Sequence, residues 1–319
     1  MMSHALILGG SGFFGKSILE AYKKGLLRQQ GIDKISIVSR RASNLKTSHP
    51  DLLDQSIHLF DADVTNCDTL PSADLIIHAA ASADAARYAL HPEEEKKNIL
   101  YGVRHFCDLA RTIFQDSKIV FVSSGAVYGA YPPEIQRIDE DYVFNSEDQI
   151  EESKHIYASA KQECEVLIER LGSTGLDVSI ARCFAFVGKY LPRDQHFAIG
   201  NFIRDGLNNQ PVVVTASSPV YRSYMHADDL ARWLVEIGFA ANPGVPIFNV
   251  GSDESISIQQ LGKKIAHYFN VKSIIASPDN RLINRYVPSI AKAKQELGLT
   301  LQMNLDQAID ATIKSIKAV

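Results

Sequence analysis

The sequence predicts an α/β protein with a doubly wound parallel sheet and a smaller, mostly helical C-terminal lobe. Short apolar, β-branched runs alternate with longer amphipathic stretches over residues 1–180 of the 319-residue chain, as expected of parallel strands covered by helices on both faces. A glycine-rich turn follows the first run, and the alternation stops after Gly188. At roughly 150 residues per domain, the length fits two domains or one large unit.

The strands are expected at the apolar runs. These lie at residues 5–8, 35–38, 57–60, 74–78, 118–122, 177–181 and, late in the chain, 246–250. Right-handed crossovers between successive strands would place a ligand beyond the carboxyl ends of the strands.

The rest of the chain is expected to cap the sheet. Helical patterns lie at residues 197–207, 228–239, 258–269 and 304–317. We therefore assign residues 1–188, with the strand at about 246–251, to the sheet domain. Residues 189–245 and 252–319 form the second lobe, and because no linker separates the two parts they should interlock.

The composition excludes several classes of protein. Hydrophobic residues make up 45% of the chain, which is too apolar for disorder, and the net charge of −4 gives no basic excess for nucleic acid. The four cysteines form no C-x-x-C pair, and the histidines do not cluster as metal ligands. The first apolar run is too short for a signal peptide, and none reaches the ~20 residues of a membrane span. A cytoplasmic protein without metal, nucleic-acid or membrane partners is expected.

The glycine-rich turn predicts a dinucleotide site and hence a Rossmann sheet. Residues 9–15 read GGSGFFG, follow the first strand and open a helix. Glycines permit close approach of the backbone, and a helix N-terminus offers N–H groups to a pyrophosphate. A glycine turn without a ligand is the alternative, which the strand before and the helix after disfavour. The expected contacts come from Gly9, Ser11, Gly12, Phe13, Phe14 and Gly15.

The end of the second strand favours NADP(H), with NAD(H) as the alternative. Ser39, Arg40 and Arg41 stand where a carboxylate would bind the adenosine ribose, and arginine there accommodates a 2′-phosphate. Residues 34–50 contain no Asp or Glu. After the third strand, Asp63-Val64 could bind the adenine amine through the Asp63 carboxylate, although a lone Asp there is more often a turn former.

A Ser, a Tyr and a Lys form the predicted catalytic constellation. Ser124 closes the fifth strand, and Tyr157 and Lys161 form a Y-x-x-x-K pattern. Because residues i and i+4 share a helix face, the Lys161 ammonium would lower the pKa of Tyr157 toward that of an acid-base catalyst. Ser124 would bind the same substrate oxygen, and Lys161 could also hold the nicotinamide ribose. A second match, Tyr268 and Lys272, has no paired serine strand and is interpreted as structural.

With these motifs assembled, the chain resembles the extended short-chain dehydrogenase/reductase superfamily, in its NAD(P)-dependent nucleotide-sugar epimerase/dehydratase branch. The resemblance covers nearly the whole chain. Its motifs lie at residues 9–15, 63–64, 78–81, 98, 123–129, 157–161, 182–184, 222–224, 248–251 and 286–298.

The resemblance also implies binding residues. It assigns the Ser-Tyr-Lys constellation as the catalytic triad and places Ala80, Ala81 and Asn98 at the cofactor. It places Arg222 and Asn201 at the diphosphate of a nucleotide sugar, a role that suits a guanidinium because it binds phosphate oxygens bidentately. Arg222 could instead pin a loop to an acidic neighbour.

Three departures from the family pattern reduce the number of reactions that we expect of this chain. Gly125 and Ala126 stand where the 4,6-dehydratases carry an Asp-Glu pair, so dehydration is not expected. Ala185 replaces a substrate-contacting Asn. Arg40 and Arg41 replace the acidic ending typical of epimerases that retain NAD+.

Several functions follow as hypotheses. The first is an oxidoreductase acting at sugar C4, in which NADPH reduces a 4-keto sugar nucleotide while Tyr157 protonates the oxygen. The second is a nucleotide-sugar 4-epimerase with retained NAD, and a third is a reductase of a non-sugar ketone or aldehyde. A non-catalytic dinucleotide-binding subunit or sensor is disfavoured by the Tyr/Lys pair. The resemblance also implies a homodimer through helices near residues 98–115 and 155–171.

Overall fold

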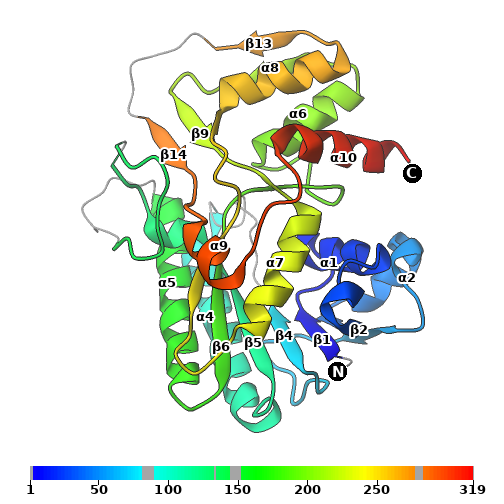
Figure 1. Cartoon of the computed structure of the whole chain (residues 1–319), viewed down its shortest axis with the longest axis vertical. Helices are drawn as coiled ribbons and strands as arrows, with labels where there is room; N and C mark the ends of the chain where they lie inside the picture. Colours follow the sequence, from blue (N-terminus) through cyan, green and yellow to red (C-terminus); the bar gives the residue numbers. More distant parts are fainter. Residues whose placement is uncertain (1–2, 81–89, 133, 144–151, 277–282, 319) are drawn as a thin grey trace.

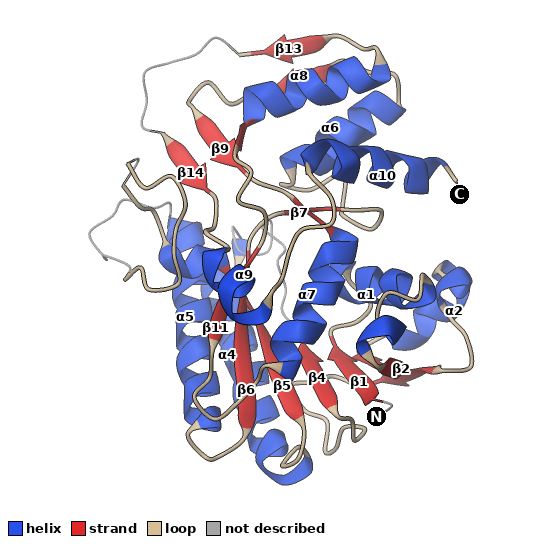
Figure 2. Cartoon of the chain, viewed as in Figure 1, coloured by secondary structure: helices blue, strands red, loops and turns tan. Residues whose placement is uncertain are grey.

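A central sheet of seven parallel strands organises the fold (Figures 1 and 2). The computed structural model describes residues 3–80, 90–132, 134–143, 152–276 and 283–318. The sheet strands are Ser3–Leu8 (β1), Ile32–Ser39 (β2), Ile57–Asp61 (β3), Leu75–His78 (β4), Lys118–Ser124 (β5), Asp177–Cys183 (β6) and Ile247–Val250 (β11). Each apolar run predicted as a strand forms one of them, so the predicted fold class is confirmed.

The sheet has a switch point between β1 and β4. The strand order is β11-β6-β5-β4-β1-β2-β3, so the chain runs outward in one direction from β1 and in the other from β4. Leu8 and His78, the last residues of the two strands, are register partners. Ligands of open α/β sheets bind beyond the carboxyl ends at such a point, which is where the glycine-rich turn begins.

Helices cover both faces of the sheet (Figure 2). Helices α1 (Phe13–Lys23) and α7 (Ala227–Phe239) pack together over the face that contains Ile7 of β1. Helices α4 (Pro92–Ile113) and α5 (Glu152–Gly172) pack over the face that contains Leu6. Because alternate residues of β1 enter separate apolar clusters, both faces are buried and the doubly wound arrangement is confirmed.

The second lobe lies over the carboxyl ends of the strands (Figure 1). Its helices are α6 (Ala198–Leu207), α8 (Ile258–Phe269) and α10 (Leu305–Lys317). Its short strands are Val212–Val214 (β8), Val220–Arg222 (β9), Ile256–Ser257 (β12), Ser273–Ile275 (β13) and Asn284–Tyr286 (β14), where β8 pairs with β13 and β9 lies between β12 and β14. Helices α8 and α10 begin at capping boxes formed by Ser257 with Gln260 and Asn304 with Gln307.

Two helices of the C-terminal half contribute to the sheet domain. Helix α7, within the range 189–245 assigned to the second lobe, buries Trp233 and Leu234 in the apolar cluster over β4 and β5. Helix α9 (Ala291–Leu297) packs on β11. An apolar helix face has the same sequence pattern whichever partner it covers, so the pattern did not reveal these contacts. The division into 1–188 and the two later ranges stays a prediction.

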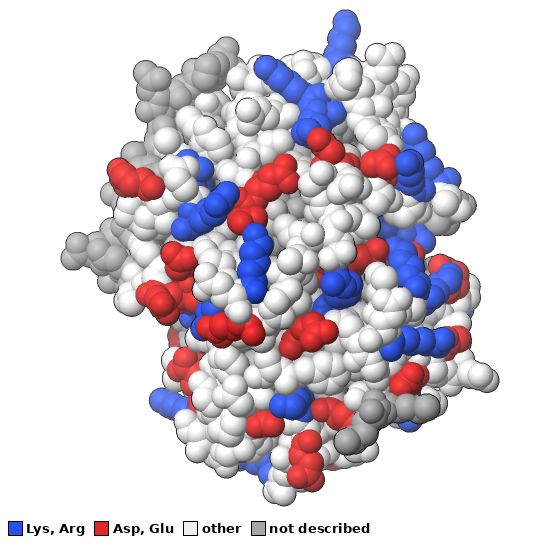
Figure 3. All heavy atoms as spheres, viewed as in Figure 1, with Lys and Arg blue, Asp and Glu red and all other residues white. Residues whose placement is uncertain are grey.

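The remaining elements are short. They are the strands Phe186–Val187 (β7) and Met225–His226 (β10), the helix Leu45–Ser48 (α2), and the 3₁₀ turns Arg28–Gln30 (η1), Ala42–Asn44 (η2), Pro50–Leu52 (η3) and Gly125–Tyr128 (η4). Acidic and basic side chains are interspersed over the face drawn in Figure 3. In the part of the chain that the structure describes, no helix is long and apolar enough to cross a membrane.

Candidate active site

The glycine-rich turn has a conformation that requires glycine at two positions. Gly9 has a φ of +85°, and a Cβ there would lie 2.7 Å from the carbonyl oxygen of Ala79. A Cβ on Gly15 would lie 2.0 Å from the carbonyl oxygen of Gly10. The turn therefore passes directly against the end of β4, and α1 starts directly on the turn.

The N-terminus of α1 fits a pyrophosphate. Gly12 is the N-cap residue, no side chain caps the helix, and its first turn contains no acidic residue. A Cβ on Gly12 would meet only the Gly9 carbonyl oxygen, at 3.8 Å, so a phosphate can approach the backbone closely. The first N–H groups and the helix dipole both favour an anion there. The turn thus fits the pyrophosphate of a dinucleotide.

The aromatic pair in the turn packs against the second half of the chain. The rings of Phe13 and Phe14 lie 6.2 and 5.6 Å from the ring of Phe186 in β7. Ser11 lies at the exposed tip of the turn and lines a cavity that Arg41 also lines. The contacts of Phe13 and Phe14 are those of packing residues, and their predicted role at the cofactor stays a prediction.

Ser39, the last residue of β2, and Asp63, which follows β3, have different surroundings. The Ser39 hydroxyl is buried and has no hydrogen-bond partner in the structure. Asp63 accepts hydrogen bonds from the Thr65 amide (3.0 Å) and hydroxyl (2.8 Å), which lower the pKa of Asp63 together with the nearby Arg40. Asp63 therefore does form a turn, as its alternative interpretation predicted, and Val64 beside it is buried in the core.

The residues implied at the cofactor by family resemblance have different surroundings. Ala80 lies directly against Gly9, since a Cβ on Gly9 would come within 2.7 Å of the Ala80 Cα. Ala81 lies outside the described residues. Asn98 is exposed on α4, and no described contact joins it to the other predicted site residues.

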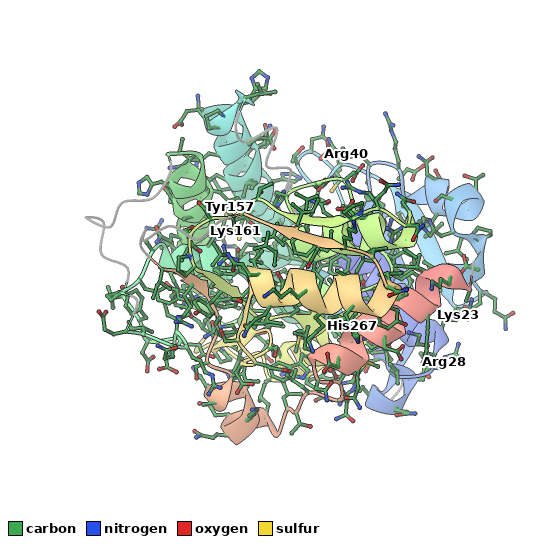
Figure 4. All side chains as sticks on the ribbon, turned by 90° about the horizontal axis from the view of Figure 1, so that it is seen from above. Lys23, Arg28, Arg40, Tyr157, Lys161 and His267 are labelled. Carbon is green, nitrogen blue, oxygen red and sulfur yellow. The ribbon has the colours of Figure 1, made fainter. Side chains whose placement is uncertain are left out.

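The structure places Ser124, Tyr157 and Lys161 at the carboxyl end of β5. Figure 4 shows Tyr157 and Lys161 together on α5 and Arg40 well apart from them, as expected of the nicotinamide and adenosine ends of one cofactor. The Lys161 ammonium is buried, donates to the Val122 carbonyl oxygen (3.1 Å) and lies 5.1 Å from the centre of the Phe121 ring. This contact fixes the cation one helical turn from Tyr157.

A buried ion pair holds α5 against the sheet. Glu165, one turn after Lys161, accepts a hydrogen bond from the Ser123 hydroxyl (2.5 Å) and pairs with Arg182 of β6 (2.8 Å). Arg182 also donates to the Tyr128 hydroxyl (2.9 Å), which in turn donates to Asn249 (2.8 Å). The helix that carries Tyr157 is thus attached to three successive strands, β5, β6 and β11.

His78, the last residue of β4, lies behind the lysine. Its side chain is fully buried and its Nε2 atom has no hydrogen-bond partner in the structure. Burial, reinforced by the charge of Lys161, lowers the pKa of His78 to about 3. The ring is therefore neutral at physiological pH and leaves Lys161 as the cation of this site.

Tyr286 is a site residue whose role the sequence reasoning missed. Its hydroxyl donates to the Cys183 carbonyl oxygen (3.4 Å) and lies close enough to the Ser124 side chain for the Ser124 hydroxyl to affect the pKa of Tyr286. Burial raises the pKa of Tyr286, and the neighbouring Tyr157 raises it further. The sequence signal was its place in the C-terminal motif, which gives no position relative to Ser124.

Arg222 carries a half-buried guanidinium next to Tyr286. It donates to the Tyr221 carbonyl oxygen (2.7 Å) and the Asn284 side chain (2.8 Å), and its guanidinium carbon lies 5.9 Å from the centre of the Tyr286 ring. Burial lowers the pKa of Arg222, and the neighbouring ionisable groups that oppose this shift are tyrosines rather than carboxylates. Among the described residues its hydrogen-bond partners are Tyr221 and Asn284, so the diphosphate role and the alternative of pinning a loop to an acidic neighbour both stay predictions.

Two further predictions concern the second lobe. Asn201 of α6 donates to the Gln195 carbonyl oxygen (2.7 Å), while its own side-chain oxygen is buried and has no hydrogen-bond partner among the described residues. Tyr268, of the second Y-x-x-x-K match, donates to Asp310 on the surface of the lobe (3.0 Å). Burial and that carboxylate raise the pKa of Tyr268, opposite to what acid-base catalysis requires.

The turn after Ser124 leaves no room for an acidic side chain. A Cβ on Gly125 would lie 2.7 Å from the ring of Phe184. Phe184 is itself held between Tyr128 and Tyr286, with ring centres 6.1 and 4.6 Å away. Packing therefore accounts for the glycine that stands in place of a dehydratase acid.

Together these groups are suited to acid-base chemistry at a carbinol or ketone oxygen beside a dinucleotide. A hydroxyl donor pair and a buried cation meet at the end of β5, and a guanidinium lies within the same cluster of side chains. Among the residues that the structure describes, no group of three His, Cys, Asp or Glu side chains is placed to hold a metal ion.

Comparison with known proteins agrees with this geometry. A model of the NAD dependent epimerase/dehydratase family matches residues 5–251. The dTDP-4-dehydro-6-deoxyglucose reductase of Escherichia coli is 26% identical over 98% of this chain and 97% of its own length. The UDP-glucose 4-epimerase of Thermotoga maritima, solved with UDP-glucose, has a TM-score of 0.79 at 19% identity over 99% of both chains. The dTDP-glucose 4,6-dehydratase DesIV of Streptomyces venezuelae, solved with NAD and TYD, has a TM-score of 0.80 at 19% identity, over 99% of this chain and 97% of that one.

Proposed function

The chain belongs to the NAD dependent epimerase/dehydratase family, and from that premise we propose that it reduces a 4-keto sugar nucleotide at C4 with NADPH. It is an NAD(P)-dependent enzyme of the extended short-chain dehydrogenase/reductase type. The observation that carries the proposal is the cluster at the end of β5, where Tyr157, Lys161 and Ser124 meet Tyr286 and Arg222.

The cofactor would be held along the carboxyl ends of β1, β2 and β4. The turn at Gly9–Gly15 would bind the pyrophosphate, and Ser39 with the two arginines after it the adenosine ribose. When bound, the nicotinamide supplies hydride transfer to and from a carbon atom. Lys161, whose ammonium donates to the Val122 carbonyl oxygen, would hold the nicotinamide ribose from the helix face that it shares with Tyr157.

Three side chains would act on the substrate. Tyr157 donates the proton that the reduced C4 oxygen needs, and the Lys161 ammonium stabilises the phenolate that remains. Ser124 donates a hydrogen bond to the same oxygen and fixes its position. Arg222, a half-buried cation without a carboxylate partner among the described residues, would bind the diphosphate oxygens of the nucleotide.

Two observations favour reduction over the other reactions of the family. The Escherichia coli reductase matches this chain from end to end, and the chain after β2 is basic rather than acidic. Elimination of water is disfavoured because Phe184 occupies the space beside Gly125. A 4-epimerase with retained NAD uses the same triad and is the second candidate, favoured by the fold shared with the Thermotoga maritima epimerase.

The test begins with the cofactor. The purified protein is denatured, and any released nucleotide is identified. NADPH oxidation is then followed with nucleotide-linked 4-keto-6-deoxy sugars. We expect NADPH-dependent formation of the C4 alcohol. The contrary result is tightly bound NAD+, interconversion of 4-epimers and no net oxidation of NADPH. It would show that the protein is the 4-epimerase and not the reductase.

The same assay tests the catalytic tyrosine. Tyr157→Phe removes the proton donor and should abolish turnover while cofactor binding is retained. Tyr268→Phe is the matched control, because it removes the hydroxyl of the other Y-x-x-x-K match, and it should leave turnover unchanged. Turnover by Tyr157→Phe at the wild-type rate would refute the assignment.

We propose a homodimer through α4 and α5, and a cytoplasmic location. The four cysteines are free, and three of them are buried, as suits a reducing compartment.

A further inference from the structure

The buried Lys161 ammonium lies over the face of an aromatic ring. Its nitrogen is 5.1 Å from the centre of the Phe121 ring, and it donates to the Val122 carbonyl oxygen (3.1 Å). The Lys161 side chain is 3% exposed and that of Phe121 is 1% exposed. The negative face of an aromatic ring attracts a cation, and it does so more strongly where water is excluded. Phe121 therefore stabilises the ammonium in this place.

Packing holds the Phe121 ring in position. Phe121 of β5 and His78 of β4 are register partners, so their side chains lie on the same face of the sheet. The two ring centres are 5.5 Å apart, and Phe106 of α4 packs on His78 at 4.6 Å. Burial lowers the pKa of His78 to about 3, so this neighbour is uncharged at physiological pH. The ring is thus fixed by neighbours that carry no charge of their own.

No carboxylate neutralises Lys161 within the described ranges of the chain. Glu163 and Glu165, which follow it on α5, pair with Lys96 (2.6 Å) and Arg182 (2.8 Å). A carboxylate beneath the ammonium would also hold it, but the opposite charge would cancel most of the field that the ammonium exerts on other atoms. An aromatic ring has no net charge. It can therefore hold the cation and leave its charge available to the reaction.

The position of the ammonium matters for two contacts at once. Lys161 has three N–H donors, and the hydrogen bond to Val122 uses one of them. The others would reach the nicotinamide ribose, while Tyr157 lies one turn away on the same helix face. A long, flexible side chain serves both only if its end is held in one place.

We propose that Phe121 is a positioning residue for Lys161, whose ring face holds the ammonium toward the nicotinamide ribose and Tyr157 without neutralising it. This role rests on the proposed contact of Lys161 with the cofactor. Phe121 itself would touch neither cofactor nor substrate.

The test replaces Phe121 by phenylalanine that carries one, two or three ring fluorines. Fluorine withdraws negative charge from the ring face in steps, while the ring keeps nearly the same shape. Titration calorimetry then measures the binding of NADPH and NADH, which share the nicotinamide ribose, and of ADP, which lacks it. We expect dinucleotide affinity to fall with each fluorine, by about tenfold with three. ADP affinity should change less than about twofold, which also shows that the variants are folded.

Turnover gives a second measurement. The kcat for NADPH-dependent reduction of a 4-keto sugar nucleotide should fall in the same order as the affinity for NADPH. The KM for the sugar nucleotide should stay constant, because its diphosphate is assigned to Arg222 and not to Lys161. A residue that only fills space would give no dependence on the number of fluorines.

Two controls isolate the contact between the ring and the ammonium. In a chain with Lys161→Met, the fluorines at position 121 should no longer change dinucleotide affinity, because the cation is gone. The same fluorinated series at Phe248 is the matched control. Phe248 of β11 is also 1% exposed and lies under a lysine, with the Lys292 nitrogen 5.2 Å from its ring centre. It should leave dinucleotide affinity unchanged.

Several results would overturn the proposal. They are wild-type dinucleotide affinity with three fluorines at position 121, an equal loss of ADP affinity, the same loss in the Lys161→Met chain, and an equal effect of the Phe248 series. A wild-type chain that binds neither NADPH nor NADH would overturn this role together with the proposed cofactor. A stepwise loss of dinucleotide affinity without any reduction of 4-keto sugars would count against the proposed reaction and leave the role of Phe121 intact.

Discussion

The His78 side chain makes the free energy of unfolding depend on pH. Its pKa is about 3 in the folded chain and 6.5 when exposed. Between these values the unfolded chain binds a proton that the folded chain excludes, so stability falls as pH decreases below 6.5 and is fully present above it. The slope contributed by one such group is at most about 1.4 kcal/mol per pH unit.

This dependence can be measured by urea unfolding between pH 7.5 and 4.5. The histidines His4, His49 and His226 also have lowered pKa values, so the wild-type slope alone does not isolate His78. We expect His78→Phe to reduce the slope. The phenylalanine ring would then lie beside Phe106 and Phe121 in place of the imidazole, and it has no group that binds a proton. An identical slope in the two proteins would contradict the assignment.

At the scale of elements, the placement of α5 decides the geometry of the triad. Glu165 and Arg182 are both largely buried, with side chains 7% and 12% exposed. Removing one partner of such a pair leaves an uncompensated buried charge. Glu165→Ala should therefore destabilise the chain by about 3–5 kcal/mol, measured by urea unfolding at pH 7.

Glu163 provides the matched control on the same helix. It pairs with Lys96 of α4 at 2.6 Å, but its side chain is 47% exposed. Exposed pairs contribute about 0–1 kcal/mol, so Glu163→Ala should have a small effect. Equal destabilisation by the two substitutions would mean that helix propensity, and not the buried ion pair, anchors α5.

The elements also show what the sequence can predict. Long apolar runs give the strands and the core helices, because burial on both faces of a sheet imposes a pattern on every residue. The Y-x-x-x-K spacing likewise predicts that Tyr157 and Lys161 share a helix face. These relations are local, and the structure agrees with them.

The position of Tyr286 beside Ser124 could not be predicted from the sequence. Tyr286 belongs to β14, a three-residue strand that pairs with β9, and its distance in sequence from Ser124 gives no sign that the two side chains are neighbours. Strands this short carry too little periodicity to predict their pairing or register.

At the scale of the whole molecule, α1 links the cofactor turn to the later parts of the chain. Lys24, the C-cap residue of α1, pairs with Asp228 of α7 at 3.0 Å. Glu20, one turn earlier, accepts a hydrogen bond from Tyr190 and lies 3.8 Å from the Lys189 ammonium. The helix that begins at the glycine-rich turn is thus fixed by residues from both halves, which explains why no linker separates them.

The helices α4 and α5 give the last prediction, which concerns assembly. They pack side by side on one flank of the sheet, and Figure 1 shows them together at the edge of the molecule. On them Tyr101 is 62% exposed and Val166 is 44% exposed. A two-fold symmetric contact would bury both residues in each copy. Light scattering after gel filtration should therefore give twice the chain mass of 35.2 kDa.

Substitution on this flank tests the contact. Tyr101→Asp places a charge within the proposed interface and should shift the mass to 35.2 kDa, because an unpaired buried charge is costly. Ile274→Asp is the control, since Ile274 is 53% exposed on β13 in the second lobe. It should leave the mass unchanged. A wild-type mass of 35.2 kDa would refute the dimer. Dissociation by Ile274→Asp alone would place the dimer contact away from α4 and α5.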